Sequence, residues 1–191
     1  MKSLFVFAAC CMTILSYGQE LPFREIPAPP STYSANTVLL RSIQGLGFRY
    51  YWATEGLRDV DLAFKPSEDG RTTRETLEHI HGLCGVIANA VVSKPNTSSS
   101  SADMSFSDLR KETLLRLKEA ADVLEKDATD FSTQKIIFVS DRGNSEFPMW
   151  NLFNGPLEDA VWHVGQIITF RRSSGNPYNS KASVFTGKVR D

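Results

Sequence analysis

The sequence has no excess of basic residues. Lysine and arginine together number 21 against 22 aspartates and glutamates, which gives a formal net charge of -1 and a pI of about 6.3. Proteins that bind nucleic acids neutralise phosphates with clustered basic side chains and usually have a high isoelectric point. The balanced charge therefore excludes nucleic acid from the partners that we expect.

Long hydrophobic runs are also scarce. The apolar run Leu4–Leu15 follows a lysine and is shorter than the roughly 20 residues that a helix needs to cross a bilayer. Small residues at Ser16 and Gly18 occupy the positions that a signal peptidase reads. We therefore expect residues 1–18 to be a cleavable signal peptide, the protein to be exported (periplasmic or secreted), and no permanent membrane anchor. A lipoprotein signal ending at Cys10 is the less favoured alternative.

Cysteine is equally rare. Cys10 and Cys11 lie within the expected signal peptide, so the mature chain would keep Cys84 alone and could form no intrachain disulfide. Cys84 falls on the apolar face of a predicted helix, where no neighbouring residue would lower its pKa. We expect it to be a buried core residue rather than a redox sensor.

The remaining composition, 41% hydrophobic and 23% charged residues, is that of one packed domain. Closely spaced prolines predict that residues 19–33 form an extended leader, either lying on the surface or held loosely, before a domain at 34–191 that ends in a C-terminal tail. Apolar residues at three- and four-residue steps predict four helices in that domain, and a hairpin or a pair of extended arms is predicted before the last one. The helices are expected at 34–56, 72–93, 105–126 and 155–172, a loop at 58–71 and the hairpin at 135–147. The fold class is therefore an all-α four-helix bundle.

Local signals mark where these helices begin. Ser34 is a candidate N-cap, the Thr72–Glu75 segment has the spacing of a capping box, and Pro156 suits the first position of the fourth helix. Gly45 and Gly47 weaken the first helix, which indicates close approach of another element, a local bend or simply tolerated glycines.

Histidine, a common metal ligand, occurs only three times. His79 and His81 lie on the second predicted helix and His163 on the fourth, where Asp159 stands one turn before it on the same face. His79 and His81 point about 160° apart, so one metal site can use only one of them. Spacing alone leaves open that these are ordinary hydrogen-bonded residues at a helix edge.

Two segments resemble a known family. The helix Glu158–Arg172, with Gly-Gln two residues after its histidine, and the segment Thr76–His81 look like the last and second helices of the DinB superfamily of metal-binding four-helix bundles. The resemblance implies metal ligands at His79, Asp159 and His163, although the family usually has a histidine at the position of Asp159. Such a site suits divalent zinc, nickel, manganese or iron.

Other residues could serve this site. Gln166 shares the face of His163 and could support a ligand, although packing is the simpler role. Four aromatic residues could wall a pocket beside the ion, although aromatic residues at helical spacing usually form core. They are Tyr50, Tyr51, Trp52 and Trp162.

The resemblance implies a metal-dependent enzyme acting on a small-molecule substrate. Export favours a hydrolase that uses metal-activated water over a thiol S-transferase, because thiol cofactors are scarce outside the cytoplasm. The alternative is a non-catalytic exported bundle, a binding or structural module with a degraded metal site. A homodimer is an open option, because Val184 and Phe185 of the tail could cap the bundle or dock on another subunit.

The signal peptide yields a direct test. We expect the exported chain to begin at Gln19, which N-terminal sequencing and intact mass would establish. An exported chain that keeps residues 1–18 would contradict the prediction.

Overall fold

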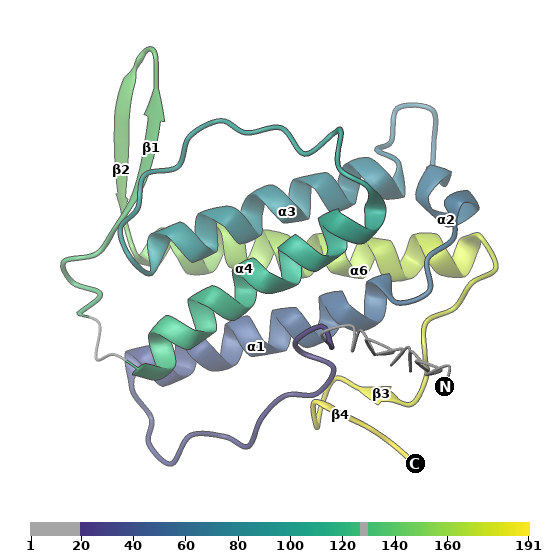
Figure 1. The fold of residues 1–191 in the computed structure, drawn as a ribbon, viewed down its shortest axis with the longest axis horizontal. Coiled ribbons are helices and arrows are strands. Elements are labelled where there is room, and N and C mark those ends of the chain that lie inside the picture. The colour runs from purple at the N-terminus through teal and green to yellow at the C-terminus, as the bar shows by residue number, and fades with distance from the viewer. Residues whose placement is uncertain (1–19, 127–129) are drawn as a thin grey trace, which may run out of the picture.

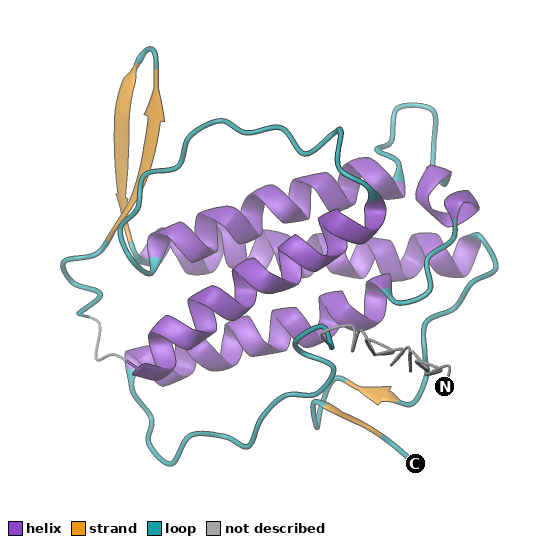
Figure 2. Cartoon of the chain, viewed as in Figure 1, coloured by secondary structure: helices purple, strands orange, loops and turns teal. Residues whose placement is uncertain are grey.

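The structure, a computed structural model, describes residues 20–126 and 130–191. The predicted signal peptide lies outside the described residues. The described chain is mostly helical with a few short strands, which confirms the predicted helical class (Figure 2). In these two ranges no helix is both long enough and apolar enough to cross a membrane.

Four long helices surround one core. They are α1 (Ala35–Thr54), α3 (Thr73–Ala90), α4 (Phe106–Lys126) and α6 (Glu158–Ser173). α1 and α3 each pack against both α4 and α6, so the four helices form a ring (Figure 1). Their apolar faces supply most of the buried side chains of the protein.

The predicted starts of the first two long helices are confirmed. The Ser34 hydroxyl accepts the backbone N–H of Thr37 at 3.2 Å and caps α1. At α3, the Thr72 hydroxyl accepts the N–H of Glu75, and the Glu75 carboxylate accepts the N–H of Thr72. Such reciprocal bonds satisfy backbone donors that the first helical turn leaves free. α3 ends at Ala90, a few residues earlier than predicted.

Helical structure also occurs where the sequence predicts none. The short helix α2 (Asp59–Ala63) lies in the stretch expected to be a loop. α5 (Trp150–Leu152) and the π-helical turn η1 (Phe153–Leu157) precede α6, so helical structure begins before Pro156 and not at it. Gly155 has non-helical backbone angles inside η1 and produces a kink there.

The predicted hairpin is confirmed as β1 (Lys135–Ser140) paired antiparallel with β2 (Gly143–Pro148). It projects from one end of the helices (Figure 1). Asn96, in the long loop between α3 and α4, donates its N–H to Ile137 and accepts the N–H of Val139. This bridge attaches the loop to the edge of the hairpin.

The leader, from Glu20 on, lies on the surface of the domain and is held there by hydrogen bonds, which is the first of the two alternatives that the sequence left open. A second small hairpin, β3 (Ala182–Ser183) with β4 (Lys188–Val189), was not predicted, and the leader residue Ile26 donates its N–H to Gly187 within its turn at 2.8 Å. The ring of Phe23 lies 2.5 Å from where a Cβ on Gly47 would stand. The close approach that the glycines of α1 indicated is therefore confirmed at Gly47.

Cys84 is a core residue, as predicted. Its side chain is buried on the inner face of α3, and this burial raises the pKa of the thiol to about 12. A thiol that stays protonated and out of solvent is a poor nucleophile, so redox sensing through Cys84 is excluded.

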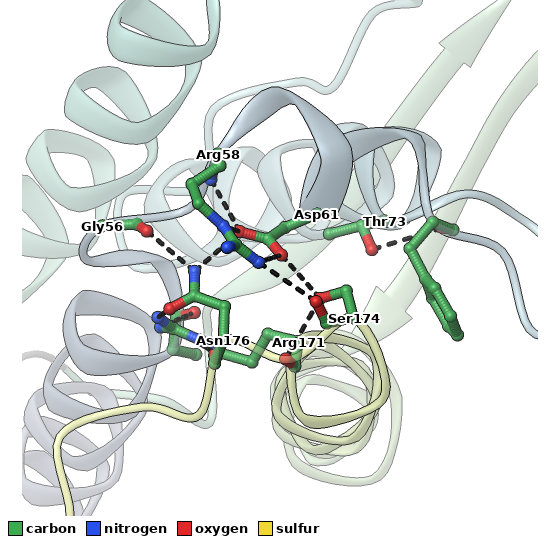
Figure 3. A network of polar contacts seen from close by, with 9 residues as sticks. Gly56, Arg58, Asp61, Thr73, Arg171, Ser174 and Asn176 are labelled. Atoms are coloured by element: carbon green, nitrogen blue, oxygen red, sulfur yellow. Dashed lines mark hydrogen bonds and ion pairs between the residues drawn. The ribbon is translucent and has the colours of Figure 1, made fainter.

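The carboxylate of Asp61, on α2, is fully buried and collects hydrogen bonds from distant parts of the chain (Figure 3). Arg58 binds both its oxygens, at 2.8 and 2.9 Å, and Ser174 and Asn176 donate to it from the segment after α6. The hydrogen bonds from Arg58 above all hold the pKa of Asp61 well below its usual range. These contacts explain why α2 is helical, because they fix its N-terminal turn from outside.

Arg171, near the end of α6, completes this network (Figure 3). Its buried guanidinium donates to the backbone oxygens of Trp52 and Ala53 at 3.2 and 2.9 Å, and to Asn176. The carbonyls at the end of α1 have no partners within their own helix, so a cation is favourable there. Arg171 thus fastens α6 to the end of α1.

The network predicts a pH-dependent loss of stability. Asp61→Asn keeps the shape but removes the charge, so we expect the free energy of unfolding at pH 7 to fall by about 2–3 kcal/mol in urea denaturation. The folded pKa of Asp61 is depressed, so its contribution is present above the unfolded pKa, about 4, and is lost as the pH falls through the folded value. The difference between parent and variant should therefore narrow on acidification. Asp59→Asn, an exposed change in the same helix, is the control, and an equal loss there would contradict the prediction.

Candidate metal centre

Two neighbouring helices bring three potential metal ligands together. His79 comes from α3, while Asp159 and His163 come from successive turns of α6. The Nε2 atoms of His79 and His163 each lie 3.2 Å from a different oxygen of the Asp159 carboxylate. The three ligand atoms all lie within 4.8 Å of one another, a spacing that could hold one metal ion. We call these residues the triad.

The rings of the triad converge on the carboxylate. The imidazoles of His79 and His163 are nearly perpendicular, with centroids 4.7 Å apart. His163 is the more sheltered, with 15% of its side chain exposed against 34% for His79 and 37% for Asp159. The site therefore has a packed inner side and a side open to solvent, as an ion that must also bind water or substrate requires.

Gln166 fixes one ring. His163 donates Nδ1–H to Oε1 of Gln166 at 2.8 Å, one turn further along α6. In a neutral imidazole, a hydrogen on Nδ1 leaves Nε2 as a lone pair. That lone pair faces the carboxylate of Asp159, so a proton or a metal cation must lie between them to make the contact favourable. The chemistry of the donor set therefore fits a cation. Of the two roles that the sequence left open for Gln166, the structure shows the hydrogen bond to a candidate ligand.

His81 does not join the triad. It is buried, with its Nδ1 3.0 Å from the hydroxyl of Thr113 on α4. That hydroxyl donates to the backbone oxygen of Leu109, so His81 is the donor to Thr113. Burial above all lowers the pKa of His81 to about 4, so the ring is neutral at pH 7. As the helical geometry required, only one histidine of α3 reaches the site.

The four predicted pocket aromatics do not gather at the triad. Tyr50 and Tyr51 are buried, and the guanidinium of Arg110 lies over the Tyr51 ring at 4.7 Å. Trp52 donates its indole N–H to the leader at Arg24. Trp162 is 70% exposed on α6, one turn from Asp159. Tyr50 and Tyr51 are therefore core residues, which is the simpler of the two roles considered for them. The indole of Trp52 holds the leader.

A groove of about 770 Å³ runs from His79 along α3. Gly82 and Val86 lie on the α3 side, and the loop at 94–99 and the tip of β1 line the other side. Beside His79, the side chain of Glu78 is paired with Arg74 at 2.6 Å. Arg74 also donates to the backbone oxygen of Met104, which fastens the loop to α3.

The sequence does not predict this groove. The sequence contains the glycines of α3 and the polar loop that follows. It does not show that the two lie side by side, because their arrangement depends on the bridge from Asn96 to β1. We call it the α3 groove.

Comparison of the chain with protein-family models, with curated proteins and with solved structures finds no match.

The triad predicts metal binding. We expect the purified chain to bind about one equivalent of Zn²⁺ in isothermal titration calorimetry, and His79→Ala and His163→Ala to lose this binding. Gln166→Ala should weaken it by roughly 10- to 100-fold, because the ring of His163 would lose its hydrogen-bonded partner.

His81→Gln is the matched control, since it replaces a histidine of the same helix that lies outside the triad. Retention of stoichiometric zinc in both triad variants would contradict the assignment. So would a folded parent chain that binds none of zinc, nickel, manganese and iron(II).

Proposed function

We propose that this chain is an exported, metal-dependent hydrolase with a four-helix bundle of the DinB type. The observation that carries the proposal is the convergence of His79, Asp159 and His163 from α3 and α6, with all three ligand atoms within 4.8 Å of one another. The ring of four long helices and the hairpin before α6 are consistent with the family resemblance of the two ligand-bearing helices.

The donor set suits a catalytic ion. Two imidazoles and one carboxylate leave at least one coordination position for water or substrate, and they suit divalent zinc, nickel, manganese or iron. When bound, such an ion supplies Lewis-acid chemistry and lowers the pKa of a water molecule toward neutrality. In this scheme His79, Asp159 and His163 hold the ion, and Gln166 keeps the lone pair of His163 pointed toward it.

The α3 groove would receive the substrate. It begins at His79, so a molecule lying in it has one end at the metal centre. Its lining combines apolar residues such as Leu83 and Phe138 with polar residues such as Asn89 and Arg116. A small molecule with both polar and apolar parts fits this surface, and hydrolysis would occur at the end next to His79.

Hydrolysis is favoured over thiol transfer. The predicted export removes the chain from cytosolic thiols, and its own Cys84 is buried with a pKa raised to about 12. No thiol of the described chain can therefore reach the triad as a nucleophile. Water is the remaining nucleophile available at the open side of the site.

A non-catalytic module is the second candidate, and one observation favours it. The Asp159 carboxylate already contacts both histidines, so protonated imidazoles could satisfy it without a metal. The triad would then be an ionic contact that joins α3 to α6, and the chain would act as a binding or structural protein.

A hydrolase screen distinguishes the two candidates. We expect the zinc- or manganese-loaded chain to hydrolyse at least one member of a panel of small ester, amide and phosphoester substrates, and His79→Ala to reduce this rate by at least about a hundredfold. His81→Gln again provides the control. Asp159→His, which restores the usual three-histidine set, should retain metal. A chain that binds metal yet hydrolyses no substrate faster than the free ion would support the non-catalytic module.

A further inference from the structure

A second groove lies on the opposite face of α6 from the triad. It has a volume of about 320 Å³ and is bounded by α1, α6 and the C-terminal segment that carries β3. Val161, Gly165 and Ile168 line it from α6. At 100° per residue, this face of the helix is turned about 160° away from His163. We call it the α6 groove.

The lining of the α6 groove is largely apolar. Phe48 and Trp52 contribute buried aromatic surface from α1, and Val164 and Ala182 add aliphatic surface. Gly165 has open space where a Cβ would stand, with no atom within 4 Å, so the groove is not filled at this point. Ligand sites of proteins typically combine such an apolar concave surface with a few polar groups.

The charged groups that line this groove are all basic. Arg49 and Arg172 are its charged lining residues, and no acidic residue accompanies them among the described lining residues. Within residues 20–126 and 130–191, neither arginine forms an ion pair with a carboxylate. Arg49 donates one hydrogen bond to the backbone oxygen of Gly45, and Arg172 lies over the ring of Tyr178 at 5.5 Å. Each guanidinium has five N–H donors, so both can still bind an anion.

We propose that the α6 groove binds a small amphiphilic carboxylate of the medium-chain fatty acid class. The apolar lining would hold the chain, and Arg49 and Arg172 would bind the carboxylate. A volume of about 320 Å³ is at the lower end of the range for small-molecule sites, which suits a short chain such as that of octanoate. The exposed rim residues Val161 and Val184 add apolar surface next to the groove.

Calorimetric titration of the full chain with octanoate tests the proposal. We expect saturable binding of one octanoate, at least about tenfold weaker binding of 1-octanol, which has the chain without the charge, and no binding of acetate. Arg49→Gln and Arg172→Gln should each weaken octanoate binding by about tenfold or more. Arg142→Gln, at the exposed turn of the β1–β2 hairpin, is the matched charge control.

A second variant tests the cavity itself. Gly165→Leu would fill the α6 groove from an exposed helical position and should abolish octanoate binding while circular dichroism remains unchanged. Equal affinities for octanoate and 1-octanol, equal losses in Arg142→Gln and Arg172→Gln, or undiminished binding in Gly165→Leu would overturn the proposal. Absence of octanoate binding together with a dimer that dissociates in Gly165→Leu would assign the groove to a second copy of the chain.

Discussion

The orientation of α6 depends on one buried cation. Arg171 lies among the terminal carbonyls of α1, and Asp61 stands in the same hydrogen-bonded cluster through Asn176 and Ser174 (Figure 3). A guanidinium with fixed partners helps to hold α6 in one rotation about its axis, together with the packing of its buried face against α1 and α3. That rotation turns the ligand-bearing face toward α3 and leaves the opposite face to line the α6 groove, so both candidate sites depend on a contact at the end of the helix.

The triad illustrates how a carboxylate changes a metal site. A third histidine would be a neutral ligand, whereas Asp159 brings a negative charge that interacts with both imidazoles at 3.2 Å. This charge favours binding of a divalent cation, and the same carboxylate contacts both histidines without one. The same three residues can therefore form either a metal centre or an ionic contact between helices. In both cases His163 donates Nδ1–H to Gln166 and directs Nε2 toward Asp159.

Much of the helical framework follows from local sequence. Capping residues such as Ser34 and Thr72 act within one turn, so the start of a helix can be predicted without knowing its neighbours. Prediction of the triad required the family resemblance as well. The spacing in the sequence places Asp159 and His163 on one face of a helix, but it does not relate either residue to His79. Elements held by distant partners escaped prediction: α2 depends on contacts of Asp61 with residues beyond α6.

The docked leader has a consequence for the order of folding. Ile26 pairs with Gly187, and Glu25 with Lys188, so the first described residues find their partners almost at the end of the chain. Contacts of such long sequence separation form late, because loop closure costs entropy before they can contribute. While the chain is still emerging, the segment from Glu20 to Ile26 lacks its C-terminal partners and stays accessible. The signal-peptide cleavage that we propose would thus precede completion of the fold.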